Sequence, residues 1–515
     1  MMSRADYLAL FLSILAVIAA YLVAELVFEQ MPHIEDEMAY VWQAQVNAKG
    51  YLSLPSPPHP RSFLVPFVVD YGGQRFGKYP PGWPAMLAVG VFLGLRSFVN
   101  PVLAGLGVWL IYRLGKRYFG ELVGLLAAAL TLTSPFFLMN SGSLLSHPFG
   151  LVLSSAFALA WPDVWNISRI DLEENPKIIK TRTWLATLVA ALSLGVLIIT
   201  RPLTAVGVAL PFIFHGLCLL VHSGRRVVKR LVVFILIVLI LTSLYFLWQF
   251  AVTGDPWLNP YTLWWDYDKV GFGPGYGHTE TGHNLHLAKI NTRFSLWVGR
   301  HDLFGWGAYS WIFLPFGLLG VIWKRNWKAL PMLSVFPSLV LVYIFYWIGS
   351  SLFGPRYYYE GLHSLTILSS VGIAFLAGLP IGIKEIYRSH VGWRKLRPLA
   401  ITGLLALLLS ANLLFYIPKR VGGMFALYGV TRSRLKPFQT AQAEELAPAL
   451  VIVHPNKWTE YGSLLELEDP FLTSPLIFTM SRGAEEDAAL AQDFPDRTVI
   501  HYYPKEPFVF YIQRK

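Results

Sequence analysis

The chain has 515 residues, of which 55% are hydrophobic and only 14% are charged, and its mean hydropathy is +0.48. Because soluble globular proteins carry about 25% charged residues, this composition excludes an ordinary soluble protein. The net charge of +11 does not indicate a nucleic-acid partner, since the Lys and Arg residues occur in short clusters between apolar runs, as in membrane proteins anchored at the inner leaflet.

Eleven segments are long and apolar enough to cross a bilayer, which takes about 20 residues of helix. They are 7–28, 84–112, 119–139, 144–162, 184–200, 203–222, 231–251, 306–323, 329–348, 361–383 and 398–417. The sequence therefore predicts an all-α, multi-pass protein of the cell (inner or plasma) membrane, in direct contact with membrane lipids. The first segment is too long for the apolar part of a signal peptide, and we expect it to be retained as a span.

Lys and Arg cluster in five of the gaps between these segments. Cytoplasmic loops are rich in Lys and Arg, and eleven spans with a cytoplasmic N-terminus place all five clusters on the cytoplasmic side. The clusters are Arg113/Lys116/Arg117, Lys177/Lys180/Arg182, Arg225/Arg226/Lys229/Arg230, Lys324/Arg325/Lys328 and Lys384/Arg388/Arg394/Lys395/Arg397. The extracytoplasmic face then carries the loops 29–83, 140–143, 252–305 and 349–360, the turn at Arg201 and the C-terminal segment.

The segment 418–515 differs from the rest of the chain in composition. It carries charges of both signs and has no apolar run long enough to span a membrane. Strand patterns at 449–453, 476–480 and 498–503, with a helical pattern at 485–492, predict a small α/β domain outside the membrane. The expected organisation is a transmembrane domain, residues 1–417, followed by an extracytoplasmic domain, residues 418–515.

The first outer loop, residues 29–83, holds the most suggestive polar residues. Asp36 and Glu37 begin a stretch with apolar residues at helical spacing, which predicts a helix along the membrane surface. The helix dipole favours acidic residues in a first turn, which is a purely structural explanation of both. Lys78 stands beside Tyr79-Pro80-Pro81 just before the second span. It can simply extend to the interface, but lysine is disfavoured on the outer face, and a phosphate partner would account for it.

Two arginines border apolar segments on the same face. Arg201 lies between the fifth and sixth spans, where its charge is costly unless it is paired or faces a cavity. Arg356 lies in Gly354-Pro355-Arg356-Tyr357-Tyr358, before the tenth span. It either pairs with Glu360 within an aromatic belt or binds a phosphate, with the Tyr rings against a sugar or a lipid head group.

Histidines occur at two places on this face. His147 follows Ser146 and either caps the fourth span or takes part in the site. The 252–305 loop contains a Gly-rich stretch and then His278, His283 and His286, of which the last two are spaced for a transition metal such as zinc. No HExxH or CxxC pattern accompanies them. A lid that closes over a substrate is an equally good explanation of so long a loop.

Together these motifs resemble the polytopic GT-C glycosyltransferases, especially the bacterial aminoarabinose transferase and protein O-mannosyltransferase branch. The resemblance covers about residues 1–420 and rests on Asp36-Glu37-x-x-Tyr40, Lys78-Tyr79-Pro80-Pro81, Arg201-Pro202 and Gly354-Pro355-Arg356-Tyr357-Tyr358. It implies the GT-C fold and transfer of a sugar from a polyprenyl phosphate to a glycan, lipid or protein acceptor on the outer face, with inversion. It leaves two alternatives for the cofactor, none or a divalent cation.

The resemblance also implies roles for single residues. Asp36 is the base and Glu37 an orienting group or second ligand, Lys78, Arg201 and Arg356 hold the donor phosphate, and Tyr40, Tyr79, His147, Tyr357 and Tyr358 shape the substrate site. Many members carry a second acidic residue between the third and fourth spans. This chain has Ser146-His147-Pro148 there, and His147 is a candidate substitute.

The residues favour this chemistry independently of the resemblance. Displacement at an anomeric carbon needs a base for the acceptor and cations for the departing phosphate, and the outer face carries both. The cytoplasmic loops lack a Gly-rich phosphate loop, which argues against a nucleotide-sugar donor. The main alternative is a transporter or flippase of lipid-linked glycans, although such proteins usually show internal repeats and charges near the bilayer midplane. A membrane-anchored sensor is a third hypothesis.

Overall fold

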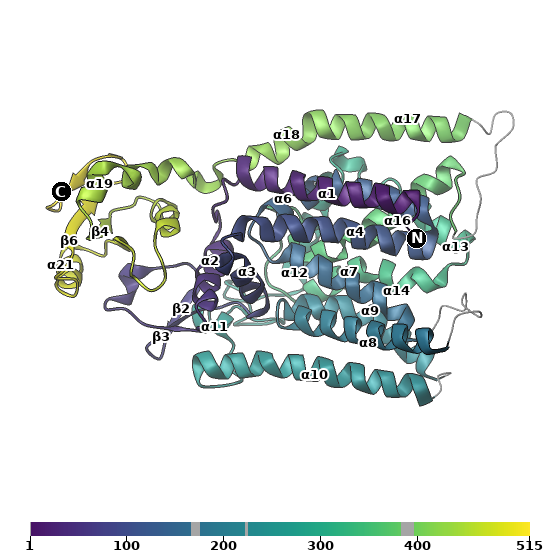
Figure 1. Ribbon diagram of the computed structural model, residues 1–515, viewed down its shortest axis with the longest axis horizontal. Helices are drawn as coiled ribbons and strands as arrows, with labels where there is room; N and C mark the ends of the chain where they lie inside the picture. The colour runs from purple at the N-terminus through teal and green to yellow at the C-terminus, as the bar shows by residue number, and fades with distance from the viewer. Residues whose placement is uncertain (1, 166–175, 222–224, 383–395) are drawn as a thin grey trace.

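The computed structural model describes residues 2–165, 176–221, 225–382 and 396–515. Long helices lie side by side in a bundle, and a small domain containing the C-terminus sits at one end of it (Figure 1). The N-terminus lies toward the other end of the bundle. The bundle and the small domain are joined by a layer of short helices and strands, which carries the candidate site.

Apolar helices coincide with all eleven expected spans. Seven helices of the described chain are long and apolar enough to cross a membrane, and two bent pairs, Glu121–Leu132 with Pro135–Gly142 and Leu285–Asp302 with Gly307–Trp323, raise the number to nine. The other two expected spans lie on α7 and on the shorter apolar stretch Trp327–Tyr343. The bundle consists of α1 (Arg4–Leu26), α4 (Val99–Phe119), α5 (Glu121–Leu132), α6 (Pro135–Gly142), α7 (His147–Val164), α8 (Pro176–Ile198), α9 (Pro202–Leu220), α10 (Arg225–Thr253), α12 (Leu285–Asp302), α13 (Leu314–Trp323), α14 (Leu330–Leu333), α15 (Val335–Tyr343), α16 (Leu362–Ala377) and α17 (Leu396–Ala411).

Two expected boundaries are wrong. The segment 84–112 is not one helix but α3 (Gly82–Phe92) and α4, because Gly94 adopts a left-handed conformation with φ of +69° and ends α3. The 252–305 loop is not irregular throughout, since its last part forms α12, which is bent by 99° from the helical segment that follows. The irregular part of this loop, together with α11 (Pro260–Trp264), is the part that reaches the site.

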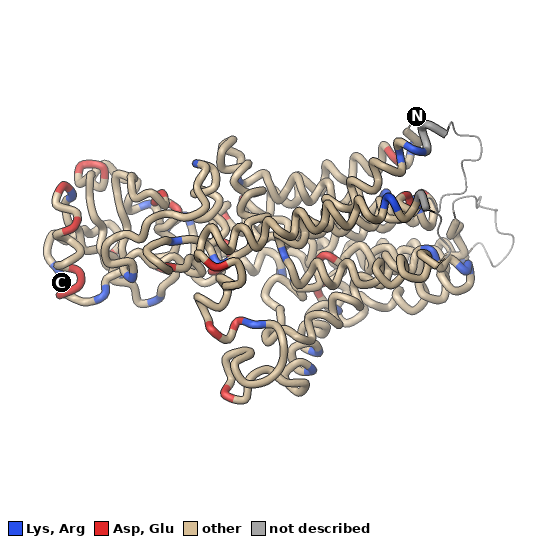
Figure 2. Tube along the Cα trace, turned by 90° about the horizontal axis from the view of Figure 1, so that it is seen from below, with Lys and Arg blue, Asp and Glu red and all other residues tan. Residues whose placement is uncertain are grey.

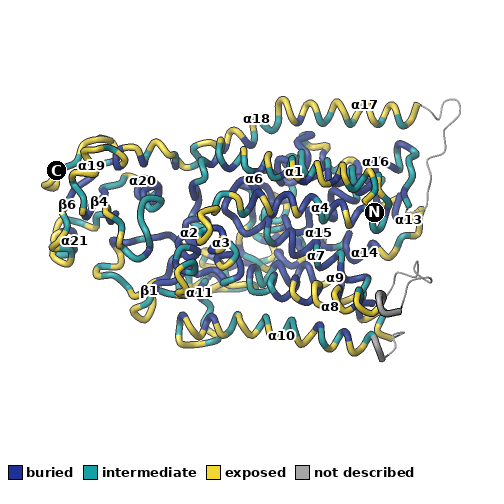
Figure 3. The backbone as a smooth tube through the Cα atoms, viewed as in Figure 1, coloured by how far each residue is buried: buried dark blue, intermediate teal, exposed yellow. Residues whose placement is uncertain are grey.

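Exposure along the helices separates an outer from an inner set. α10 and α17 carry exposed apolar residues along their length, whereas the helices in the middle of the bundle, such as α7, are mostly buried (Figure 3). An apolar helix surface without protein neighbours is what lipid contact requires. The fold is therefore that of a multi-pass membrane protein.

Basic residues gather at the end of the bundle that holds the N-terminus (Figure 2). Lys116 pairs with Asp6 at 2.7 Å, Arg117 and Arg182 both pair with Asp163, and the Asn326 amide donates to the carbonyl of Tyr118. These contacts bring the first, second and fourth clusters to one end, as expected. The backbones of Lys384, Arg388, Arg394 and Lys395, and the side chains of Lys177, Arg225 and Arg226, lie outside the described residues.

The joining layer is built from the first outer loop. It contains α2 (Glu35–Ala48), α3 and a small antiparallel sheet of β1 (Leu54–Pro55), β3 (Gln74–Gly77) and β2 (Val68–Tyr71) in that order. The sequence placed α2 on the membrane surface with one face exposed. Its residues Glu37 to Ala44 are instead all buried, because α3 packs against one side and the C-terminal domain against another.

The C-terminal domain has the α/β character that the sequence predicts. α19 (Ala441–Glu445), β4 (Ala449–Val453), α20 (Trp458–Gly462), β5 (Leu476–Met480), α21 (Ala484–Gln492), β6 (Thr498–Tyr502) and β7 (Phe510–Tyr511) follow the short helix α18 (Ile417–Arg420). The sheet order is β5-β4-β6-β7, with β4 parallel to both β5 and β6. All five residues of β4 are buried, as in the central strand of a parallel sheet.

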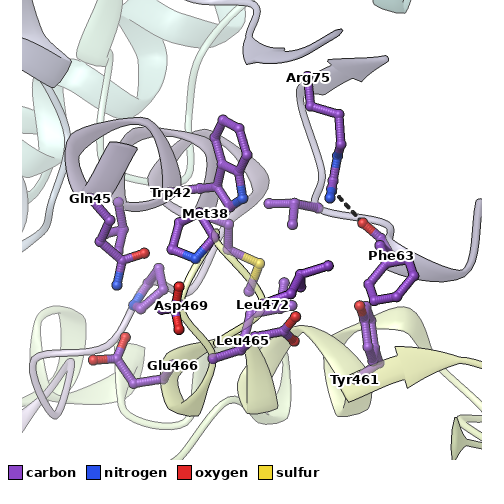
Figure 4. Close-up of a pocket in the computed structure, with 15 residues that line it drawn as sticks. Met38, Trp42, Gln45, Phe63, Arg75, Tyr461, Leu465, Glu466, Asp469 and Leu472 are labelled. Carbon is purple, nitrogen blue, oxygen red and sulfur yellow. Dashed lines mark hydrogen bonds between the residues drawn. The ribbon is translucent and has the colours of Figure 1, made fainter. Parts of the chain in front are cut away.

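This domain packs on the first outer loop. A small pocket between them is walled by Met38 and Trp42 of α2 on one side and by Tyr461 and Leu465 of the domain on the other (Figure 4). Arg75 of β3 enters the same interface and donates to the carbonyl of Phe63 (Figure 4). A salt bridge of 2.6 Å between Arg96 and Glu466 lies at its edge. The domain is therefore held directly over α2, the helix that carries Asp36.

Candidate active site

A cavity of about 890 Å³ lies between the bundle and the joining layer. Seven of the residues expected from the sequence line it: Asp36, Tyr40, Lys78, Tyr79, Arg201, Arg356 and Tyr357. Glu35, Asp268, Tyr261, Trp265, Tyr343 and Trp458 also line it. The wall is rich in aromatic rings, with a few polar groups among them, which is the usual make-up of a small-molecule site.

Asp36 is the central carboxylate of the cavity. It occupies the first turn of α2, and its side chain retains 21% exposure. The Tyr79 hydroxyl donates to its Oδ1 at 2.7 Å, and Arg356 Nη2 lies 3.6 Å from its Oδ2. Burial by itself raises the pKa of Asp36, but Arg356, the Tyr79 hydroxyl and Lys78 together hold that pKa below its ordinary value. The group is therefore a carboxylate at neutral pH.

Lys78 lies in an aromatic cage. Its Nζ is 3.7 Å from the centre of the Phe67 ring and 4.7 Å from that of Trp265, and it pairs with Asp268 Oδ2 at 3.2 Å. Asp268 also accepts hydrogen bonds from the Tyr346 hydroxyl and the Trp347 indole. Burial lowers the pKa of Lys78, while Asp268 and Asp36 act in the opposite direction. The ammonium thus meets one carboxylate directly and faces the cavity with donors to spare.

Arg201 is held at the junction of α8 and α9 by a set of polar partners. Its Nε is 3.2 Å from Glu360 Oε1, and its two amino groups donate to Ser146 Oγ and the Tyr343 hydroxyl. His147 Nδ1 lies 3.2 Å from the same Glu360 oxygen. Of the two alternatives for Arg356, the pair with Glu360 is therefore wrong, since Glu360 faces Arg201 and Arg356 faces Asp36.

Arg356 differs from Lys78 and Arg201 in its hydrogen bonds. One amino group, Nη2, faces Asp36, whereas the other, Nη1, is buried and has no hydrogen-bond partner among the described residues. A buried donor without a partner costs about 1–3 kcal/mol. The Arg356 guanidinium also lines the cavity, which makes it a candidate partner for an anionic ligand there.

Three expected site residues lie outside the cavity. Glu37 is 1% exposed, and its two oxygens accept hydrogen bonds from the backbone amides of His33, Ile34 and Leu144. It caps α2 and fixes the start of the loop before α7, so its role in this structure is structural. His147 lies behind Arg201 at the buried Glu360, and Tyr358 packs in the core of the bundle.

The three loop histidines do not form the expected metal site. His283 Nε2 lies 2.9 Å from the Ile344 carbonyl and its ring stacks on Phe272, His278 packs on Trp347, and His286 is exposed. Within the described ranges, the one group of three potential ligands that converge is in the C-terminal domain, away from this loop.

Neither Asp268 nor Glu35 is among the site residues predicted from the sequence. Asp268 occurs among aromatic residues of the long loop, and only the fold shows that Lys78 reaches it across 190 positions of sequence. Glu35 precedes Asp36 and points into the cavity, and burial raises the pKa of its carboxyl group.

Comparison with known proteins identifies the fold of this chain. No protein-family model matches the sequence, and a search of curated proteins gave no match. Among solved structures, the chain shares the GT-C fold of polytopic membrane glycosyltransferases. One is ArnT from Cupriavidus metallidurans bound to undecaprenyl phosphate, with a TM-score of 0.57 and 14% identity over 97% of this chain and 90% of that chain. Another is the oligosaccharyltransferase AglB from Archaeoglobus fulgidus with an inhibitory peptide and a dolichol-phosphate, with a TM-score of 0.52 and 11% identity over 95% of this chain and 69% of that chain.

Proposed function

We propose that this protein transfers a sugar from a polyprenyl-phosphate donor to an acceptor hydroxyl or amine, and that the reaction takes place in the Asp36 cavity. The observation that carries the proposal is the pair of Asp36 and Arg356, one an ionised carboxylate and the other a guanidinium with an unused buried donor, side by side on one cavity wall. The two solved structures of the same fold, one with undecaprenyl phosphate and one with dolichol-phosphate, agree with a lipid-phosphate ligand.

The chemistry is a single displacement. The acceptor atom forms a bond to the anomeric carbon of the sugar while the bond from that carbon to the phosphate oxygen breaks. The phosphate oxygen keeps the electron pair, and the Asp36 carboxylate takes the proton of the acceptor. Although its low pKa makes Asp36 a weak base, the acceptor becomes acidic as its new bond forms, so a late proton transfer suffices. Attack opposite the phosphate inverts the anomeric carbon.

Three cations would stabilise the departing phosphate. Arg356 offers its unpartnered Nη1, Lys78 has donors beyond its contact with Asp268, and Arg201 lies on the same cavity. Fixed charges that face the developing phosphate charge in a dry cavity lower the barrier, because they need no reorganisation during the reaction. Within the described chain, no three His, Cys or carboxylate side chains converge on this cavity to form a metal site. We propose side-chain cations as the means of charge neutralisation.

The walls of the cavity suit a sugar and its lipid. Tyr40, Tyr261 and Trp265 line the cavity with aromatic rings, the kind of side chain that packs against a pyranose. Trp458 is the first residue of α20, so the C-terminal domain contributes to the wall and has a part in admitting the acceptor. The cavity is lined by residues of α2 and α11, which lie at the end of the bundle opposite the basic clusters (Figures 1 and 2). The usual excess of Lys and Arg on cytoplasmic loops supports an extracytoplasmic position for it.

Two measurements test the proposal. Purified protein in detergent should bind undecaprenyl phosphate, followed by quenching of the many Trp residues at the cavity, and Arg356→Met should weaken this binding. Cells with and without the protein should differ in a glycosylated lipid, glycan or protein detected by mass spectrometry. A flippase would instead move the intact donor across the membrane and leave the bond between sugar and phosphate unbroken. Failure of Arg356→Met to alter lipid-phosphate binding would refute the assignment of the cavity.

A further inference from the structure

A second group of polar side chains lies in the C-terminal domain, remote from the Asp36 cavity. His454 follows β4, His501 lies in β6, and Asp487 lies in the first turn of α21. His454 Nε2 and His501 Nδ1 are 3.0 Å apart, and a potential ligand atom of each of the three residues lies within 4.8 Å of the others. Asp487 and His501 are buried, and His454 is half-buried.

The sheet places these side chains together. β4 and β6 are parallel neighbours in which Ile452 pairs with His501, and the His454 amide continues the ladder by donating to the Tyr502 carbonyl. Since side chains alternate between faces, His454 and His501 project from the same face as Ile452. α21 covers that face, with Leu490 packed beside Ile452. Asp487 stands three residues before Leu490 and therefore points the same way.

The position is also the one where ligands bind in open parallel sheets. β5 and β6 flank β4 on opposite sides, so the chain reverses its direction of travel across the sheet between β4 and β6. A crevice forms at the carboxyl ends of the strands at such a switch point. His454 and His501 lie at those carboxyl ends.

We propose that His454, His501 and Asp487 form a binding site for a divalent transition metal ion of the zinc type. Two nitrogen ligands at about 2.0–2.1 Å from one ion are about 2.9–3.4 Å apart for ligand angles between 90° and the tetrahedral value. The observed 3.0 Å between the two histidine nitrogens fits that range. Imidazole with carboxylate suits zinc and its neighbours rather than magnesium or calcium, which prefer oxygen ligands alone.

The surroundings of the three ligands support this assignment. Ser481 Oγ donates to Asp487 Oδ2 at 2.7 Å, and the Arg482 amide donates to Oδ1 at 3.0 Å, which orients the carboxylate as outer partners orient metal ligands. The Tyr503 ring stacks on His454 at 4.4 Å. Arg514 Nη1 lies 3.3 Å from Asp487 Oδ2, so an ion would displace this guanidinium, whose side chain is 38% exposed.

The test is zinc binding by the full-length protein in detergent, after metal has been removed with a chelator. Titration with Zn²⁺ against a chromophoric competitor should give one site per chain, and Co²⁺ should give the absorption bands of a nitrogen–oxygen site. His454→Ala and His501→Gln should each weaken Zn²⁺ binding by at least about 100-fold, since even outer partners of a metal are worth about 10–100-fold. Arg514→Ala should strengthen binding, because it removes a cation that competes for Asp487.

The matched control is His286→Ala, an exposed histidine of the long loop, which should bind Zn²⁺ as the unaltered chain does. Thermal unfolding verifies that each variant is folded. If His501→Gln fails to fold, the Zn²⁺ affinity of His454→Ala alone tests the proposal, since His454 is only half-buried. The proposal is overturned if the unaltered chain binds no stoichiometric Zn²⁺, or if His454→Ala retains the full affinity.

Discussion

Replacing Asp36 by Asn tests whether Asp36 acts as a catalytic base or only as a structural carboxylate. Asn keeps an oxygen that can accept from the Tyr79 hydroxyl, so the hydrogen bond of 2.7 Å has a replacement, whereas the charge and the proton acceptor are lost. General-base catalysis contributes about 10²–10⁴-fold, so we expect the rate of sugar transfer from bound donor to fall by about that factor, or about 3–5 kcal/mol in barrier height.

The same substitution should not weaken the binding of the lipid phosphate. Arg356 loses an anionic neighbour 3.6 Å away, which at that separation attracts it by about 1–5 kcal/mol for effective dielectric constants from water to the protein surface. The freed guanidinium should bind undecaprenyl phosphate as tightly as before or more tightly. The assay pairs release of polyprenyl phosphate in a single turnover with a lipid-binding titration.

The control for Asp36→Asn is Asp70→Asn, in the same outer loop, where the carboxylate is exposed and accepts a hydrogen bond from Ser56. Its transfer rate and lipid affinity should both be unchanged. Undiminished turnover in Asp36→Asn would refute the role of Asp36 as the base. A loss of lipid binding equal to the loss of turnover would show instead that Asp36 only positions its neighbours.

The remaining predictions concern the other groups around the cavity. Arg356→Met and Arg201→Met should each weaken undecaprenyl-phosphate binding by about 10-fold or more, since each removes a charge-assisted contact worth about 1.5–3 kcal/mol. If both variants bind the lipid as tightly as the unaltered chain does, the phosphate site is contradicted. Glu37→Gln should lower the free energy of unfolding by about 1–3 kcal/mol, because an amide group then faces a backbone N–H, but leave lipid affinity unchanged. Burial raises the pKa of Glu37 to about 7, so the folded state binds its proton more tightly than the unfolded state. Stability measured by thermal unfolding should therefore fall as the pH rises from about 4.5 to 7, and Glu37→Gln should abolish this fall. Because the pKa of Asp36 lies below its ordinary value, Asp36 stays ionised between pH 7 and 5. Its protonation should therefore not lower the rate of sugar transfer in this range. EDTA should leave undecaprenyl-phosphate affinity unchanged, and a loss of affinity restored by a divalent ion would contradict side-chain neutralisation.

Much of the architecture follows from the pattern of apolar runs. Segments of about 20 apolar residues must be helical in a bilayer, and the basic gaps fix which loops share an end. Those two constraints suffice to place Asp36, Lys78, Arg201 and Arg356 at one end of the bundle, although they are far apart in sequence. The strands of the C-terminal domain also follow from composition, because short β-branched and aromatic runs stand between turn residues.

The sequence-based predictions are wrong where tertiary contacts, rather than local sequence, determine the structure. Gly94 interrupts an apolar run that hydropathy alone cannot divide, and its left-handed backbone is visible only in the fold. Glu37 and Asp36 are neighbours of the same type, yet helix rotation sends one to backbone amides and the other to the cavity. The partners of the buried cations, Asp268 for Lys78 and Glu360 for Arg201, come from distant segments that no local spacing connects.

The most direct test of the central claim is mass spectrometry of lipids and glycans from cells that lack the protein and are complemented with the unaltered chain, Asp36→Asn or Asp70→Asn. We predict that the unaltered chain and Asp70→Asn restore one sugar-modified product. Asp36→Asn should fail to restore it and should leave the polyprenyl-phosphate sugar to accumulate. The same product in Asp36→Asn cells at the level of the unaltered chain would contradict sugar transfer by this cavity.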